Sequence, residues 1–220
     1  MSLHLRRDTE QLKKDLLTMG GMVEQMVNRS IQALRDRDRQ LAEDVIAGDK
    51  DIDLWEVQVE EECLKMLALH QPVASDLRFI AAVLKINTDL ERMADLAVNI
   101  AELAAFLATK PPLPFPEQLD PMTEAAMGMV GKSLEAFVTL NAGLARQVLR
   151  QDDYIDQMNR EVIDTILRLM QSNPDTVERA IRFFSVSRHL ERIADHATNI
   201  AEDVIYMVEG EIVRHHPERI

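Results

Sequence analysis

One segment of thirteen residues occurs twice in this chain, 100 positions apart. Residues 90–102 read Leu-Glu-Arg-Met-Ala-Asp-Leu-Ala-Val-Asn-Ile-Ala-Glu, and residues 190–202 read Leu-Glu-Arg-Ile-Ala-Asp-His-Ala-Thr-Asn-Ile-Ala-Glu. Ten of the thirteen positions are identical. In a chain of 220 residues, this repeat predicts an internal duplication and therefore two similar halves.

The duplication continues upstream at an offset of 103 positions. The matches are Met26-Val27 with Met129-Val130, Ser30 with Ser133, Leu41-Ala42 with Leu144-Ala145, and Asp49, Ile52 and Asp53 with Asp152, Ile155 and Asp156. The offset therefore falls by three between these matches and the thirteen-residue repeat. We expect one turn in the second half to be three residues shorter than its counterpart in the first.

Helical periodicity dominates both halves. Apolar residues recur every three or four positions, for example at Leu12, Leu16, Met19 and Val23, as on the buried face of a helix. No stretch shows the alternation of a strand bounded by turn residues. The expected helices lie near 5–37, 38–69 and 73–108 in the first half, and near 118–149, 152–171 and 174–209 in the second. The chain should be all-α, with two tandem three-helix bundles related by internal pseudo-symmetry.

Proline marks the boundary between the halves. Five of the eight prolines lie between Pro111 and Pro121, and a helix cannot continue through such a run. We expect a first repeat over residues 1–110, a proline-rich linker over 111–117 and a second repeat over 118–220. Pro72 and Asn173-Pro174 mark turns inside the halves, and Gly48 and the charged run 36–39 are expected kinks or breaks.

Charge and composition exclude several classes of function. The formal net charge of −13 argues against DNA or RNA as the main partner, because phosphate binding needs a basic surface. Cys63 is the only cysteine, so no intramolecular disulfide can form. No apolar run of about 18 residues is present, and the N-terminal segment lacks the apolar core of a signal peptide. We expect a soluble cytoplasmic protein with no nucleic-acid partner and no membrane insertion.

Each half contains two pairs of carboxylates spaced four residues apart, which places both members of a pair on one face of a helix. The last two helices of each half should form an antiparallel hairpin, centred on Pro72 or on Asn173-Pro174. Residues equidistant from the turn then lie level, so each pair faces a pair on the next helix. The sequence thus predicts one quartet of Asp49, Asp53, Glu91 and Asp95, and a second quartet of Asp152, Asp156, Glu191 and Asp195.

Four carboxylates at one level repel one another unless a cation lies among them. Arg92 and Arg192 adjoin the glutamates, but a sequence neighbour on a helix points about 100° away. Carboxylates bind hard cations and can also bind zinc, so all eight are candidate metal ligands for zinc, iron, manganese or magnesium. Asn99 and Asn199 lie one turn further along the same stripes and are candidate weak extra ligands.

Two other functions fit the same residues. The first is a carboxylate-bridged di-metal enzyme, against which the lack of any Glu-x-x-His motif counts. The second is a metal-free helical scaffold protein whose acidic faces are simply solvated. His196, next to Asp195, is expected at the surface or in an interface more often than on a bound ion.

The repeated motifs resemble those of the PhoU family. The most specific segments are Leu90-Glu-Arg-Met-Ala-Asp95 and Leu190-Glu-Arg-Ile-Ala-Asp195, each with Asn-Ile-Ala-Glu a few residues later. Pro72-Val-Ala-Ser-Asp-Leu-Arg78 is similar to the family's entry into its third helix. The resemblance covers nearly the whole chain, from Asp8 to about Met207.

The resemblance implies two three-helix bundles and a regulatory function without catalysis. The family acts as a negative regulator of the phosphate-starvation response and is thought to link the phosphate ABC transporter with a sensor histidine kinase. Some members carry zinc or iron clusters on paired E/D-x-x-x-D motifs, which here fall on the same eight carboxylates. The expected partners are the transporter's ATPase subunit, the sensor histidine kinase, and a second copy of the chain in a homodimer.

Overall fold

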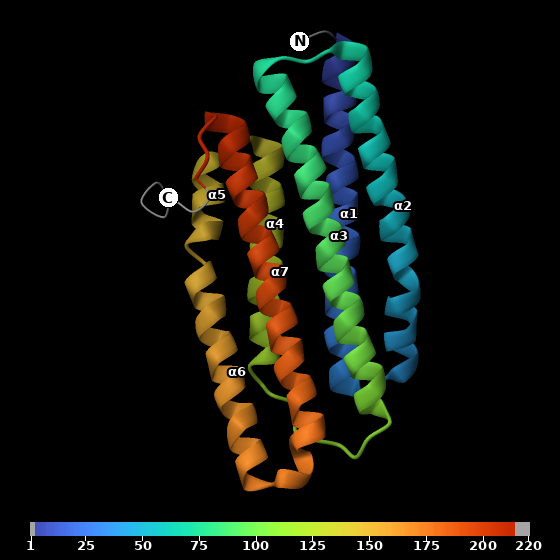
Figure 1. Cartoon of the computed structure of the whole chain (residues 1–220), viewed down its shortest axis with the longest axis vertical. Coiled ribbons are helices and arrows are strands. Elements are labelled where there is room, and N and C mark those ends of the chain that lie inside the picture. Colours follow the sequence, from blue (N-terminus) through green and yellow to red (C-terminus); the bar gives the residue numbers. More distant parts are fainter. Residues whose placement is uncertain (1–2, 214–220) are drawn as a thin grey trace.

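The computed structural model describes residues 3–213, and every regular element in that range is helical (Figure 1). The elements are α1 (Leu3–Asp36), α2 (Arg39–His70), α3 (Ala74–Ala108), α4 (Leu119–Thr139), α5 (Ala142–Leu149), α6 (Asp152–Ser172), the short 3-10 helix η1 (Pro174–Thr176) and α7 (Val177–Glu209). The all-α fold with a repeated arrangement of helices is therefore confirmed.

The expected fourth helix over 118–149 is wrong, because the structure divides it. Leu140 has a left-handed backbone, with φ of 55°, and ends α4. Asn141 then caps α5, and its side chain accepts a hydrogen bond from Leu144 N at 3.0 Å. A cap of this kind satisfies one of the free amide groups at a helix start and stabilises a new helix there.

The same break occurs in the first half, 103 residues earlier. Asp38 caps α2 by accepting from Leu41 N at 3.0 Å, and Arg37 has φ of 55°. The expected break in the run 36–39 is thus confirmed, whereas Gly48 lies inside α2 without a break. It follows that α4 matches α1, that α5 and α6 together match α2, and that α7 matches α3.

A non-helical segment over 109–118 joins α3 to α4. Arg37 donates to the main-chain oxygens of Ala108, at 3.2 Å, and of Lys110. Arg179 of α7 donates to Pro111 O at 3.0 Å, so residues from both halves hold the segment. Pro121 lies in the first turn of α4, where a proline leaves no hydrogen bond unmade.

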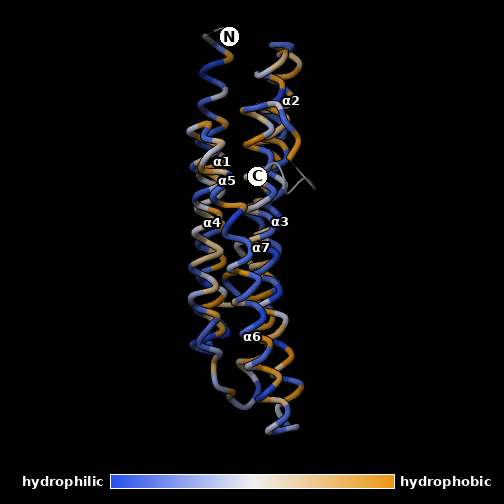
Figure 2. The backbone as a smooth tube through the Cα atoms, turned by 90° about the vertical axis from the view of Figure 1, so that its left-hand side faces the viewer, coloured by the Kyte–Doolittle hydropathy of each residue, from blue (hydrophilic) through white to orange (hydrophobic). Residues whose placement is uncertain are grey.

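The helices form two layers (Figure 2). One layer contains α1, α4 and α5, and the other contains α2, α3, α7 and α6. In the second layer α3 and α7 lie side by side and run in opposite directions, since Lys85 pairs with Asp203 at 2.7 Å and Asp89 with His196 at 2.8 Å. This register places Glu91 of α3 level with the region of Asp195 on α7.

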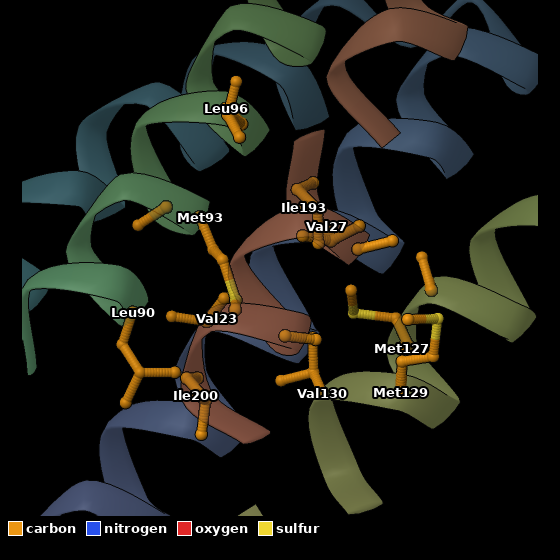
Figure 3. Packing of buried hydrophobic residues seen from close by; sticks show 14 of the residues in the cluster. Val23, Val27, Leu90, Met93, Leu96, Met127, Met129, Val130, Ile193 and Ile200 are labelled. Atoms are coloured by element: carbon orange, nitrogen blue, oxygen red, sulfur yellow. The ribbon is translucent and has the colours of Figure 1, made fainter. Parts of the chain in front are cut away.

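One continuous core joins the halves, and the repeated segment supplies its centre. Leu90 and Met93 of α3 and Ile193 and Ile200 of α7 point toward apolar side chains of α1 and α4 (Figure 3). Ala94, Ala97 and Ala101 and their counterparts Ala194, Ala197 and Ala201 are fully buried, so these small residues allow close helix packing. Within residues 3–213 no helix is long and apolar enough to cross a membrane.

Candidate functional site

The first predicted quartet assembles in the groove between α2 and α3. Asp49 and Asp53 come from α2, and Glu91 and Asp95 come from α3. The side chains of Glu91 and Asp95 are 16% and 44% exposed. α1 packs on α2 and α3 from the other layer and leaves the opposite side of this helix pair uncovered by α1 (Figures 1 and 2). We call these four residues the first patch.

Mutual repulsion in the first patch follows the pairing that the hairpin predicts. Burial raises the pKa of Asp49, and the charges of Asp53 and Asp95 raise it further. Burial likewise raises the pKa of Glu91, with contributions from Asp95 and Asp53, while Arg92 lowers it. Asp49 therefore interacts with Asp95 and Asp53 with Glu91, as expected for residues at equal distances from the turn.

The second predicted quartet assembles between α6 and α7. Asp152 and Asp156 come from α6, and Glu191 and Asp195 come from α7. Burial raises the pKa of Asp152 to about 6, followed by the charges of Asp195, Asp156 and Asp153. Burial also raises the pKa of Glu191, and Arg188 partly offsets that effect. We call these four residues the second patch.

Arginine side chains contact carboxylates of both patches, which the sequence analysis did not predict. Arg92 contacts Glu91 at 3.3 Å and Asp95 at 3.1 Å, because its side chain is long enough to reach both. The expectation that Arg92 points away is therefore wrong. In the second patch Arg188 forms an ion pair with Glu191, and Arg160 lies 4.0 Å from Asp156.

Glu56 joins the first patch and was not predicted. Its pKa is raised by burial and then by the charges of Glu60 and Asp53. The signal was available in the sequence, since Glu56 follows Asp53 by three residues and Asp49 by seven, on the same helical stripe. Its repeat counterpart is Asn159, so the fifth carboxylate is absent from that position in the second patch.

The ligand type of both patches suits a hard cation, because all eight side chains are carboxylates. In the part of the chain that the structure describes, Glu91 Oε2 and Glu191 Oε2 are buried and accept no hydrogen bond, although an arginine lies beside each. Burial and neighbouring carboxylates raise the pKa values of Glu91 and Glu191, and Arg92 and Arg188 already offset part of that effect. Among residues 3–213, however, no group of three or more His, Cys, Asp or Glu side chains is arranged to hold a metal ion. A bound ion therefore requires side-chain rotation, and the role of the eight carboxylates as ligands stays a prediction.

Two other expected residues lie between the patches. His196 Nδ1 lies 2.8 Å from Asp89 Oδ1, which confirms the expected interface position of this histidine. Asn199 Nδ2 donates to the same Asp89 oxygen at 3.3 Å, so this amide is turned toward α3. Asp89 thus anchors the contact between α3 and α7.

Both patches lie on the same face of the molecule. The helices that carry them, α2, α3, α7 and α6, form one layer, and the antiparallel register of α3 and α7 places the patches at one level (Figures 1 and 2). The two groups of carboxylates therefore form an acidic band across the middle of a four-helix face.

Comparison with known proteins identifies the family. The model of the PhoU domain matches twice, over residues 16–104 and 119–204, so each match covers one repeat. The chain belongs to the PhoU family. The phosphate-specific transport system accessory protein PhoU homolog of Aquifex aeolicus (strain VF5) is 40% identical over 213 residues, which cover 97% of this chain and 96% of that protein.

Other PhoU proteins show the same extent of similarity. The phosphate-specific transport system accessory protein PhoU of Escherichia coli (strain K12) is 31% identical over 208 residues, covering 94% of this chain and 86% of that protein. The crystal structure of PhoU from Pseudomonas aeruginosa matches with a TM-score of 0.88 at 36% identity, over 94% of this chain and 99% of that one. PhoU from Streptococcus pneumoniae matches with a TM-score of 0.89 at 30% identity, over 95% and 99%.

Proposed function

We propose that this chain is a cytoplasmic accessory protein of phosphate transport and a negative regulator of the phosphate-starvation response. In this proposal it is an adapter without catalytic activity, linking the ATPase subunit of a phosphate ABC transporter to a sensor histidine kinase. The observation that supports it is the presence of two PhoU repeats that cover nearly the whole chain, together with relatives named accessory proteins of phosphate-specific transport.

The acidic band is the proposed site of control. The eight carboxylates of the two patches would hold one or more cations, which would add positive charge to that of Arg92 and Arg188 and lower the raised carboxylate pKa values. Neutralised side chains can then keep one fixed arrangement on the face that a partner contacts. Without the cation, the carboxylates keep their negative charge and repel one another, so this face differs in charge from the cation-bound face.

A pull-down combined with elemental analysis tests both parts of the proposal. The full-length protein, purified from phosphate-replete cells, should carry metal and retain the transporter ATPase subunit. The variant Glu91→Gln with Asp95→Asn should lose metal from the first patch and bind less of the ATPase subunit. Retention of the ATPase subunit and of repression by a variant in which all eight carboxylates are amides would contradict the cation part and leave the adapter role intact.

The metal-free scaffold remains the second candidate function, because arginines already contact the carboxylates of both patches. The two candidate functions predict different effects of amide substitution and of added metal on the stability of the protein. If the patches are only solvated, amide substitution should stabilise the fold, and added Mn²⁺ or Zn²⁺ should leave the melting temperature of the unmodified protein unchanged.

A further inference from the structure

Apolar side chains are exposed on the four-helix face near the turn of the α2–α3 hairpin. Leu64 of α2 and Leu77 of α3 are 53% and 46% exposed, and Leu84 of α3 is partly exposed. Leu64 precedes the proline of the turn by eight residues, whereas Leu77 and Leu84 follow it by five and twelve. In an antiparallel hairpin Leu64 therefore lies between the levels of the other two, and we call these three residues the first apolar group.

The first apolar group shares a groove with the first patch. Leu77 and Leu84 precede Glu91 by fourteen and seven residues, close to four and two helical turns. Leu64 follows Asp53 by eleven residues, close to three turns. Residues separated by whole turns lie on one face of a helix, so the groove between α2 and α3 carries apolar side chains near the turn and carboxylates about 20 Å further along.

The second hairpin repeats the apolar group at the opposite end of the molecule (Figure 1). The counterparts of Leu64, Leu77 and Leu84 are Leu167, Val177 and Phe184, which are 47%, 43% and 36% exposed. Single exposed apolar residues are common on protein surfaces. Matched groups at the same place in two diverged repeats instead indicate surfaces that a partner covers.

The charges beside the two apolar groups differ. On α2 a stripe of carboxylates leads from the first patch toward the turn, formed by Asp49, Asp53, Glu56 and Glu60. Burial and then the charge of Glu60 raise the pKa of Glu56, so these two side chains lie close together. In α6 the last two carboxylates of the stripe are replaced by Asn159 and Ile163.

The second groove also gains positive charge. The exchanges from the first half to the second are Val57 to Arg160, Thr88 to Arg188 and, with the opposite sign, Lys50 to Asp153. Arg188 pairs with Glu191 and so lies on the second patch. The groove between α2 and α3 therefore remains the more negative of the two, although the apolar groups match.

We propose that the groove between α2 and α3 binds a basic amphipathic helix of a partner protein. The apolar residues of that helix would cover Leu64, Leu77 and Leu84, and its lysines and arginines would pair with the carboxylate stripe of α2. From Leu77 to Asp95 the groove spans about 27 Å, which a helix of about 18 residues fills. The inference rests on the adapter role proposed above for the existence of a protein partner, and it needs no bound cation.

Charge favours this occupant over the two other surfaces that an apolar group could meet. A second copy related by a two-fold axis through this groove would set the acidic stripe against itself, and the like charges would repel each other. Anionic lipid surfaces attract basic segments and repel an acidic groove. A basic helix supplies both the apolar side chains and the opposite charge.

Fluorescence anisotropy of a labelled synthetic peptide tests the proposal with the full-length chain in chelator. The peptide has 18 residues, with leucines at helical spacing in one half and lysines and arginines in the other. Leu64→Ser with Leu77→Ser should weaken its binding by about tenfold or more, because the apolar contact is lost. Glu56→Gln with Glu60→Gln should also weaken binding and should reduce its dependence on salt.

Leu54→Ser is the matched control. Leu54 is 69% exposed on the same helix, but it points about 100° away from Asp53 and thus out of the groove. This variant should bind the peptide as the parent chain does. All of these side chains are exposed or partly exposed, so every variant should keep the melting temperature of the parent chain, which shows that lost affinity does not arise from misfolding.

The possible results separate the groove from the adapter role. Equal binding of a scrambled peptide of the same composition, or no binding of either peptide, overturns the groove as a helix site. A dimer or binding to phosphatidylglycerol vesicles that Leu64→Ser with Leu77→Ser abolishes, without peptide binding by the parent chain, overturns it in favour of those occupants. If the parent chain retains the transporter ATPase subunit but not the peptide, only the groove is wrong; if it binds the peptide but not the ATPase subunit, only the adapter role is wrong.

Discussion

Folding raises the pKa of Asp152 by a large amount. Burial and the charges of Asp195 and Asp156 raise its pKa from 3.8 to about 6. The folded protein therefore binds a proton that the unfolded chain has lost between about pH 4 and pH 6. The associated stability is present below pH 4 and is lost as the pH rises through about 6.

Asp152→Asn should remove this pH dependence. In chelator, the free energy of unfolding of the parent protein should fall by about 1–2 kcal/mol relative to the variant between pH 4 and pH 7, since part of the side chain remains in water. Urea unfolding across this pH range measures the difference. Asp51→Asn, an exposed site outside both patches, is the control and should follow the parent curve. Parallel curves for the parent protein and Asp152→Asn would show that the raised pKa is wrong.

Cys63 illustrates how burial changes the reactivity of a side chain. It is fully buried in α2, and burial raises the pKa of its thiol to about 12, with further contributions from Glu60 and Glu62. We expect a thiol reagent at pH 8 to react with the native protein at least a hundredfold more slowly than with protein unfolded in urea, because the thiolate is both rare and inaccessible. Equal rates, followed by absorbance, would contradict the buried position.

The carboxylates of the patches were predictable residue by residue, whereas their neighbours were not. Repetition at a fixed offset singled out Asp49 and Asp152, and hairpin symmetry assigned their partners across the turn. Glu56 escaped detection because its repeat counterpart, Asn159, is not a carboxylate. Arg92 escaped because a long side chain reaches positions that the direction of its Cβ does not indicate.

At the scale of helices, the caps Asp38 and Asn141 decide where the second helix of each half begins. Each accepts a hydrogen bond from the amide three residues later, at 3.0 Å. Asn141→Ala should lower the free energy of unfolding by about 1 kcal/mol, and Asp38→Ala by a similar amount. Asn141→Ser keeps a hydrogen-bond acceptor and should lower the free energy of unfolding by only a few tenths of a kcal/mol. Thermal unfolding measures these differences, and equal stability of the Ala and Ser variants would contradict the cap.

The position of the break in the fourth expected helix was present in the sequence but was masked by periodicity. Apolar spacing continues through Leu140, so the pattern alone predicts one long helix over 118–149. The repeat offset places Asn141 opposite Asp38, and two good capping residues at matched positions indicate a helix start in both halves. The second interruption, between α5 and α6 at residues 150–151, has no counterpart in α2 and could not be inferred from the repeat.

At the scale of the whole molecule, the contact between α3 and α7 depends on residues that the duplication did not preserve. Lys85 and Asp89 on α3 correspond to Ser185 and His189 on α7, while Asp203 and His196 on α7 correspond to Leu103 and Leu96 on α3. The Lys85–Asp203 and Asp89–His196 contacts therefore form at one end of the α3–α7 contact and have no equivalents at the other. Internal symmetry predicts the two hairpins but not this register, and the register is what aligns the two patches in one band.

The pair of Lys85 and Asp203 gives a direct test of how firmly this register is held. The Asp203 side chain is 5% exposed and lies 2.7 Å from Lys85, which is itself 50% exposed. Lys85→Met should lower the free energy of unfolding by about 1–3 kcal/mol, because it removes a positive charge from a buried carboxylate. The double variant Lys85→Ser with Asp203→Leu copies the residues at the other end of the contact and should recover most of that loss.

Urea unfolding of the full chain measures all of these variants. Lys65→Met breaks an exposed pair with Glu62 and serves as the control, with an expected change below about 0.5 kcal/mol. If Lys85→Met is no more destabilising than Lys65→Met, the buried ion pair does not hold α3 against α7. If Lys85→Met also lowers Mn²⁺ affinity at both patches, the antiparallel register is what keeps the two sites in their binding geometry, and the two halves then act as one cation-dependent face.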